Sequence, residues 1–184
     1  MRGLRRKHPA TVVEVWVEDE ARLGLKPITR RVWAPKGQRP VSNGKTDYAW
    51  LYVYGFAQPA TGRLFSAFLP RVKTALMSHA LAAFAAWADP ANEKLLVVVV
   101  DNAGWHVAKK LVVPPNVVLH RLPPCTPELQ PIETVWPLVR EAVANRPFRG
   151  IGHLKRVVRR RCTYLADHPD TVRGRIGFRW AITI

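Results

Sequence analysis

The chain has 184 residues, a length that fits one domain and suffices to bury a substantial core. Hydrophobic residues make up 48% and charged residues 23%, as in ordinary globular proteins, but 29 Lys and Arg against 13 Asp and Glu give a net charge of +16. This charge favours a polyanionic partner, either nucleic acid or an anionic membrane surface, with a merely solubilising surface as the alternative.

The sequence gives no sign of a membrane span, an export signal or a disulfide framework. The longest apolar stretch, Ala80 to Ala88, has nine residues, whereas a span needs ~20. The basic N-terminal segment lacks a following apolar core and a cleavage site. Cys125 and Cys162 have no metal-binding spacing, so we expect both to be reduced thiols in a cytoplasmic protein.

The first part of the chain has the two-residue periodicity of strands. Val12 to Glu18 alternates, and Asp19 shares the parity of its odd-numbered valines, so Asp19 should emerge on their face at the end of this strand. A short strand is expected around Arg30 to Trp33. Asp47 to Gly55 is a strong strand, and Leu64 to Leu69 is its hairpin-like partner.

The periodicity then changes to that of helices and buried strands. Val72 to Ala88 predicts a helix, and the six aliphatic residues Leu95 to Val100 predict a strand buried on both sides. A short helix at His106 to Leu111 and a strand at Val117 to Leu119 should follow. Two further helices are expected, at Glu133 to Asn145 and at Gly152 to Ala166. This order predicts an α/β fold with a mixed sheet, antiparallel first and parallel later, flanked by helices.

Three acidic residues stand where these elements end or begin. Asp101 directly follows a buried strand, where ligand sites of open sheets commonly lie, although an Asp there can also cap the next helix. Asp19 lies within Glu18-Asp19-Glu20, which could equally be a solvated acidic patch. Glu133 stands at a helix start, where the helix dipole by itself favours an acid.

Taken together, the three acids predict a metal site. If the two strands lie side by side, the helix can bring Glu133 over their ends, and clustered carboxylates repel unless a cation neutralises them. All-oxygen ligation suits Mg²⁺ or Mn²⁺, and a pair of such ions can activate water and stabilise the leaving oxygen in phosphodiester cleavage. A nucleic-acid substrate would also explain the basic composition.

The segments around these acids resemble a known family. EDEARLGLKP followed by RRVWAPKGQRP is similar to the first catalytic segment of the mariner-type superfamily, in its branch of bacterial insertion-sequence DDE transposases. VVVVDNAGWH resembles the second segment, and LPPCTPELQPIETVW resembles the third, a Pro-rich loop that leads to Pro-Ile-Glu and an aromatic residue. The motifs keep the family's order and cover roughly residues 13 to 140.

The resemblance implies a ribonuclease-H-like fold and a metal-dependent DNA endonuclease and strand-transfer activity. Asp19, Asp101 and Glu133 would be the catalytic residues and the ligands of two Mg²⁺ or Mn²⁺ ions. Transposon ends and target DNA would be the partners of a homodimer, in the cytoplasm of a bacterium and associated with its nucleoid. Family members carry N-terminal helix-turn-helix modules, for which the residues before the first strand leave no room, so we expect a single catalytic domain over residues 1–184.

Pro137 constrains the helix that carries Glu133. A proline has no amide proton, so Pro137 cannot donate to the carbonyl of Glu133 one helical turn earlier. The helix must therefore begin late or kink, and the orientation of Glu133 depends on which occurs.

Neighbouring residues have functional and structural interpretations. Asn102 and His106 could orient phosphate or water beside Asp101, although a His one turn into a helix is more often a surface residue. Arg22 could contact phosphate or pair with Glu18.

Aromatic side chains are expected to be structural. Trp33 should pack on the sheet and Gly37 should form a turn. One face of the second strong strand is aromatic and is expected to pack in the core or under a helix rather than to stack on unpaired bases: Tyr48, Trp50, Tyr52 and Tyr54.

The last third of the chain is strongly basic, with 11 Lys or Arg against 3 Asp or Glu from Arg140 onward. In its final predicted helix one face is apolar: Leu154, Val157, Val158, Cys162 and Leu165. The basic residues off that face form either a solvated or a phosphate-contacting surface: Lys155, Arg156, Arg159 and Arg160.

The leading hypothesis is therefore the catalytic domain of a cut-and-paste transposase. One alternative is a decayed or repurposed domain that binds nucleic acid without chemistry. Another is an RNA-cleaving hydrolase with the same fold.

Overall fold

Among the residues that the computed structural model describes (11–41, 47–124 and 126–182), five strands form one mixed sheet in the order β3-β2-β1-β4-β5. The central strand β1 (Val12–Gly24) pairs antiparallel with β2 (Trp50–Ala57) and parallel with β4 (Lys94–Val100). β3 (Leu64–Leu69) continues the antiparallel side and β5 (Val117–Arg121) the parallel side. The predicted order of antiparallel and parallel strands is confirmed.

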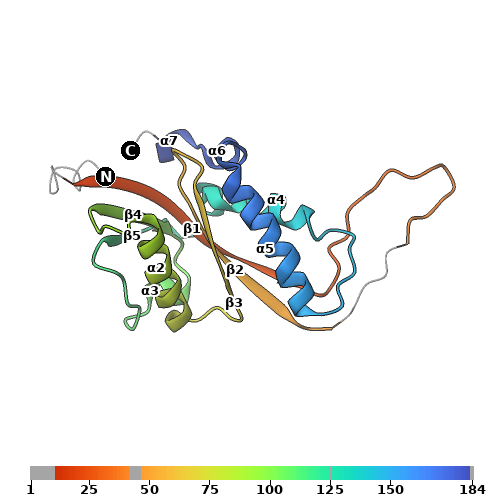
Figure 1. Ribbon diagram of the computed structural model, residues 1–184, viewed down its shortest axis with the longest axis horizontal. Coiled ribbons are helices and arrows are strands. Elements are labelled where there is room, and N and C mark those ends of the chain that lie inside the picture. Colours follow the sequence, from red (N-terminus) through yellow and green to blue (C-terminus); the bar gives the residue numbers. More distant parts are fainter. Residues whose placement is uncertain (1–10, 42–46, 125, 183–184) are drawn as a thin grey trace.

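Helices cover both faces of the sheet (Figure 1). One face carries α2 (Thr74–Ala88), which contacts the short α3 (Gly104–Val107). The other helical elements follow β5 in the chain: the 3₁₀ turns η1 (Pro127–Leu129) and η2 (Pro131–Thr134), and the helices α4 (Trp136–Glu141), α5 (Ile151–Asp167), α6 (Pro169–Ile176) and α7 (Arg179–Ile182). Residues of η2, α4, α5 and α6 pack in one hydrophobic cluster on the second face.

The alternation of β1 divides the core into two layers. Val17 packs in the cluster that contains Leu154 of α5, whereas Trp16 packs in the cluster of α2. The rings of Trp16 and Phe84 meet edge to face with their centroids 5.0 Å apart. Asp19 has the parity of Val17 and therefore faces the α4–α5 side, as predicted from the valine pattern.

β1 is longer than the sequence pattern predicted. Instead of ending at Glu18 it continues to Gly24, because residues up to Gly24 pair with β2. Asp19 therefore lies inside the strand, opposite Gly55, and does not follow its end. The remaining strands lie within a few residues of their predicted bounds, and β3 matches them.

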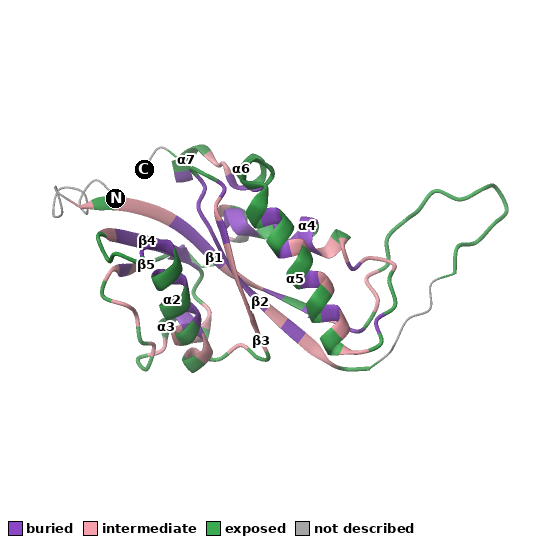
Figure 2. Cartoon of the chain, in the orientation of Figure 1, coloured by how far each residue is buried: buried purple, intermediate pink, exposed green. Residues whose placement is uncertain are grey.

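The strand predicted around Arg30 to Trp33 does not form. Residues 25–41 have no strand pairing, and most of this segment is exposed (Figure 2). Trp33 is fully exposed, so the expectation that it packs on the sheet was wrong. Gly37 does stand in a turn, with a φ of +87° that a side chain would disfavour.

The helix predicted at Glu133 to Asn145 is divided just before Pro137 and ends at Glu141, four residues earlier than predicted. Glu133 belongs to η2, and α4 begins only at Trp136, with Pro137 in its first turn. A proline is tolerated there because the first amides of a helix have no intrahelical acceptor. The expectation that the helix begins late is therefore confirmed.

Helices α2 and α5 lie within two residues of their predicted bounds. The helix predicted at His106 to Leu111 is shifted: it begins at Gly104 and ends at Val107, so its predicted part beyond Val107 does not form. Helices α6 and α7 had no sequence prediction. No helix among the described residues is long and apolar enough to cross a membrane.

The aromatic face of β2 is divided between core and surface. Tyr54 is fully buried in the α2 cluster, and Tyr52 packs against that cluster, as expected. Tyr48 lies before the strand and is 88% exposed, so the expectation of core packing fails for it. Cys162 is a free, buried thiol on the apolar face of α5, and Cys125 lies outside the described residues.

Candidate active site

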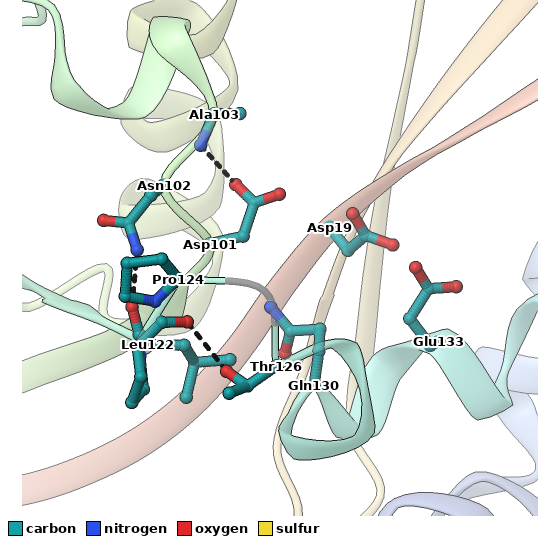
Figure 3. Close-up of a pocket in the computed structure, with 10 residues that line it drawn as sticks. Asp19, Asp101, Asn102, Ala103, Leu122, Pro124, Thr126, Gln130 and Glu133 are labelled. Atoms are coloured by element: carbon teal, nitrogen blue, oxygen red, sulfur yellow. Dashed lines mark hydrogen bonds between the residues drawn. The ribbon is translucent and has the colours of Figure 1, made fainter.

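A cavity of about 360 Å³ contains all three predicted acids. Asp19 enters it from β1, Asp101 from the residue after β4, and Glu133 from η2 (Figure 3). The other lining residues come from the segments after β4 and β5: Asn102, Ala103, Leu122, Pro123, Pro124, Thr126 and Gln130. Because β1 and β4 are neighbouring parallel strands in a register that pairs Val17 with Val99, Asp19 lies beside the carboxyl end of β4, which Asp101 follows.

Asp101 is held by two contacts at one oxygen. Its Oδ1 accepts a hydrogen bond of 2.9 Å from the amide of Ala103 and lies 2.7 Å from Nδ1 of His106. The first contact is a local turn, which agrees with the alternative structural interpretation of Asp101. The side chain is still 53% exposed, so its second oxygen is available to the cavity. The structural and the catalytic interpretation of Asp101 are therefore compatible.

Asp19 is anchored by an aromatic residue of the third motif. The indole Nε1 of Trp136 donates a 2.7 Å hydrogen bond to Oδ2 of Asp19. Gly55, opposite Asp19 on β2, makes room for this ring, since a Cβ there would lie 2.6 Å from the Trp136 ring. The absence of a side chain at Gly55 is thus a requirement of the site.

The environment of Asp19 favours its protonated form. Burial raises the pKa of Asp19, the hydrogen bond from Trp136 lowers it, and the charge of Glu133 raises it again, giving a pKa of about 7. In Figure 3 the carboxylates of Asp19 and Glu133 point toward one another. A bound cation would relieve this repulsion and hold Asp19 ionised at neutral pH.

Glu133 reaches the cavity because the turn that carries it is anchored at both ends. Nε2 of Gln130 donates to the backbone carbonyl of Glu18, 2.9 Å away. The hydroxyl of Thr134 lies 2.7 Å from the carbonyl of Pro131 and 2.9 Å from the carbonyl of Arg175 in α6, so its one proton is shared between these two acceptors. Glu133 itself is exposed, as suits a residue that contacts a ligand.

His106 is buried, contrary to the more usual surface position of a histidine one turn into a helix. It is 1% exposed and lies between Asp101 on one side and Glu18 and Glu20 on the other. Burial lowers the pKa of His106, but the two glutamates raise it to about 11. His106 is thus a positioning contact of Asp101 from beneath the cavity.

The two remaining supporting candidates have structural contacts. The amide of Asn102 donates to the carbonyl of Leu122, 2.6 Å away, and so joins the segments that follow β4 and β5. The guanidinium of Arg22 lies over the ring of Trp50, 4.4 Å from its centroid, and is exposed. The alternative pairing of Arg22 with Glu18 is not formed, since Glu18 pairs with His106.

The four basic residues predicted on α5 are all exposed, off the apolar face of the helix: Lys155, Arg156, Arg159 and Arg160. Three of them line a shallow surface hollow together with Tyr164. Arg161, by contrast, is partly buried, donates to the carbonyl of Leu138 at 2.9 Å and pairs with Glu141. The four exposed basic residues of α5 therefore form a basic surface that remains accessible to a ligand.

Solved structures share this architecture. The chain is similar to the Mos1 mariner paired-end complex with Mn, with a TM-score of 0.59 and 14% identity over 90% of this chain and 56% of that one. It is also similar to the Mos1 strand transfer complex, with a TM-score of 0.57 and 14% identity over 95% of this chain and 58% of that one. The chain thus spans somewhat more than half of these relatives. The likeness defines a ribonuclease-H-like fold, as the sequence motifs implied.

Comparison of sequences identifies the family to which the chain belongs, whereas the solved structures define only its fold. Residues 14–155 match the family model described as DDE superfamily endonuclease, and the chain belongs to this family. It is also 39% identical over 101 residues to the uncharacterized protein y4pE/y4sA of Sinorhizobium fredii, covering 54% of this chain and 73% of that protein.

Sequence reasoning missed several residues that build the site. In the sequence, Trp136 stands out only as the aromatic residue after Pro-Ile-Glu, and no pattern marks Gln130 or Gly55 as part of the site. The signal was present for Trp136, since an indole beside a motif acid can donate a hydrogen bond. The pairing of Gly55 with Asp19 depends on strand register, which the sequence does not specify.

Proposed function

We propose that this chain is the catalytic domain of a cut-and-paste DNA transposase, which cleaves phosphodiester bonds at transposon ends and joins them to target DNA. The observation that carries the proposal is the meeting of Asp19, Asp101 and Glu133, each from a different motif, in one cavity. Family membership supports a nuclease-type enzyme. The similar structures are described as Mos1 paired-end and strand transfer complexes, which supports transposon ends as the substrate.

The donor set of the cavity fits Mg²⁺ or Mn²⁺. Three carboxylates supply only oxygen ligands, which these ions prefer. The raised pKa of Asp19 indicates that this carboxylate needs a neighbouring cation to stay ionised beside Glu133. Two similar structures are described as complexes with Mn and with Mg. A pair of such ions, when bound, would polarise the attacking and the leaving oxygen of the phosphodiester.

The protein's own part in this chemistry is positioning. The indole of Trp136 fixes Asp19 at one oxygen, and the amide of Ala103 and the ring of His106 fix Asp101 at one oxygen. Each anchored carboxylate keeps its other oxygen for the cavity. Carboxylates held in this way need little reorganisation when charge develops on the phosphate.

The basic surface supplies the affinity for DNA in this proposal. A second hollow beside the cavity is lined by Arg22, Arg71 and Lys73 together with Asp19 and Asp101. These basic side chains lie next to the acids and can bind the phosphates that flank the cleaved bond. The exposed basic residues of α5 would extend this contact over the second face of the sheet.

The test is metal-dependent cleavage by the chain joined to a module that binds the transposon ends. With Mg²⁺ or Mn²⁺ we expect nicking at the ends, and Asp101→Asn should reduce it by on the order of 10² or more. The matched control is Glu128→Gln, which removes an exposed acid of η1 outside the cavity lining and should leave the rate unchanged. Undiminished cleavage by Asp101→Asn would exclude the assigned mechanism.

The decayed, non-catalytic alternative predicts salt-sensitive DNA binding without a metal requirement. Calorimetry with Mn²⁺ separates the catalytic proposal from this alternative. A working triad should bind Mn²⁺ in the wild type, and Asp19→Asn should abolish that binding. The constraint that Pro137 places on the helix does not support this alternative, since Glu133 lines the cavity although α4 begins late. An RNA–DNA hybrid offered to the same protein tests the ribonuclease alternative.

A further inference from the structure

A second cluster of ionisable side chains lies on the opposite face of β1 from Asp19. Glu18 and Glu20 flank Asp19 in the sequence, so the alternation of the strand directs both away from the cavity and toward α3. His106 of α3 meets them there. Its Nε2 lies 3.2 Å from Oε2 of Glu18 and 3.5 Å from Oε1 of Glu20.

This cluster is buried, and two carboxylates share one imidazole in it. The side chains of Glu18 and His106 are fully buried, and that of Glu20 is 5% exposed. Both carboxylate oxygens of Glu18, Oε1 of Glu20 and Nε2 of His106 have no hydrogen-bond partner among the described residues. One imidazolium can balance only one of the two carboxylate charges, so the buried cluster retains a negative charge that a bound cation would balance.

The spacing of these atoms matches the coordination of a metal ion. All three ligand atoms lie within 4.8 Å of one another, and among the described residues no such group is formed by the triad. In a tetrahedral site with bonds of about 2.0–2.2 Å, ligand atoms stand roughly 3.3–3.6 Å apart. The contacts of His106 with Glu18 and Glu20, 3.2 and 3.5 Å, are close to this edge length but lack hydrogen-bond geometry.

We propose that Glu18, Glu20 and His106 bind a structural divalent transition-metal ion, with Zn²⁺ as the best-fitting ion, beneath the catalytic cavity. One imidazole with two carboxylates gives the nitrogen and oxygen ligands that zinc accepts, whereas Mg²⁺ prefers the all-oxygen triad. The ion would balance both glutamate charges while His106 stays neutral. The site is therefore distinct from the triad in position and in metal preference.

The second nitrogen of His106 connects this site to the catalytic one. When Nε2 binds a metal, Nδ1 carries the ring proton and donates it to Oδ1 of Asp101, 2.7 Å away. Such carboxylate–histidine–metal arrangements fix the orientation of both partners. The metal would thus tie the segment of β1 around Asp19 to the end of β4, which carries Asp101.

One of the three proposed ligands borders a hollow beside the cavity. The hollow that contains Arg71 and Lys73 is also lined by Glu20, Asp101 and Trp105. Glu20 is therefore the proposed ligand that lies nearest to the surface, although its side chain is almost buried.

Metal content tests this proposal directly. The chain is incubated with Zn²⁺ and excess Mg²⁺, dialysed against metal-free buffer and analysed by elemental mass spectrometry. We expect about one Zn²⁺ ion to be retained per chain. The variant Glu20→Gln, which keeps the shape of the side chain, should lose this ion. The triad variant Asp19→Asn/Glu133→Gln should retain it, so the result is independent of transposase activity.

Cobalt identifies the ligand geometry. Co²⁺ in a site with few ligands absorbs visible light far more strongly than six-coordinate Co²⁺, and we expect this spectrum in the wild type and the triad variant but not in His106→Asn. A melting curve of metal-free Glu20→Gln confirms that this variant folds. Absence of retained zinc and of the cobalt spectrum in the wild type would overturn the proposal, as would equal zinc retention by Glu20→Gln.

Discussion

Trp136 and Asp19 lie 117 positions apart in the chain, yet the indole Nε1 of Trp136 donates a 2.7 Å hydrogen bond to the Asp19 carboxylate. The ring occupies the space that Gly55 leaves open on the neighbouring strand. One side chain therefore joins the strand that carries Asp19 to the segment that carries Glu133. The triad geometry depends on this packing as well as on the acids themselves.

The substitution Trp136→Phe should weaken metal binding at the triad while keeping most of the ring packing. Asp19 would lose the hydrogen bond that lowers its pKa, and burial would then raise that pKa further. We expect Mn²⁺ affinity at neutral pH to fall by about tenfold, corresponding to a lost hydrogen bond to a charged group of about 1.5 kcal/mol. Titration calorimetry measures this.

The matched control for that experiment is Trp180→Phe. The indole nitrogen of Trp180 is buried and has no hydrogen-bond partner within the part of the chain that the structure describes, so the same chemical change removes no described interaction with an acid. Manganese affinity should stay at its wild-type value. If Trp136→Phe also binds Mn²⁺ normally, Trp136 has only a packing role.

Gly55→Ala should destabilise the protein and impair the site together. Its Cβ would lie 2.6 Å from the Trp136 ring, closer than carbon atoms can approach, so the ring must move away from Asp19. We expect a loss of about 1–3 kcal/mol in the free energy of unfolding, as in other overpacked cores. Denaturant unfolding measures this loss.

Gly174→Ala provides the contrasting result for the same change. Gly174 lies within α6, and a Cβ there would meet no atom within 4 Å. This variant should gain about 0.5–1 kcal/mol, because alanine loses less backbone entropy than glycine in a helix. A similar stability of both variants would mean that the clash at Gly55 is relieved without cost.

The sequence predicted the order of elements because hydrophobic periodicity is local. The alternating valines of β1 and the aliphatic run before Asp101 specify strands by themselves, and Pro137 specifies the late start of α4. The motifs then selected three acids that the fold brings to one cavity. Local pattern and family motifs were sufficient for that much of the site.

The parts that sequence reasoning missed depend on contacts between distant segments. The extension of β1 beyond Glu18 follows from its pairing with β2. Ala21 and Leu23 continue the alternation of the valines, but the acidic run from Glu18 to Glu20 interrupts it in the sequence. The burial of His106 follows from the packing of α3 on β1, where it meets Glu20. Residue type alone predicts that Trp33 packs on the sheet, and the structure leaves it exposed.

The stability of the metal-free protein should depend on pH through Asp19. Its pKa is about 7 in the folded protein and near 3.8 when unperturbed, so between these values the folded state binds the extra proton. This contribution to stability is complete below about pH 4 and is lost as the pH rises toward 7. Asp19→Asn removes it.

The measurement is the melting temperature of both proteins in chelator between pH 5 and pH 8. The melting temperature of Asp19→Asn should exceed that of the wild type by an amount that increases with pH. The buried Glu18 and its contact with His106 are the same in both proteins, so they do not contribute to this difference. Addition of Mn²⁺ should reverse the order, because only the wild type gains a bound ion. A difference that stays constant with pH would contradict the assigned titration.

The basic surface of α5 should contribute to DNA binding without sequence preference. Arg156 and Arg159 are exposed and line one hollow, so their replacement by glutamine removes charge without removing core contacts. If each contacts one phosphate, the slope of log affinity against log salt should decrease by about 0.9 per residue, or roughly 2 in total. The control Lys109→Gln/Lys110→Gln removes the same charge from exposed residues after α3. Fluorescence anisotropy over a salt series measures both slopes. Equal slopes for the two double variants would show that DNA binding depends only on net charge and that the basic residues of α5 form a solvated surface.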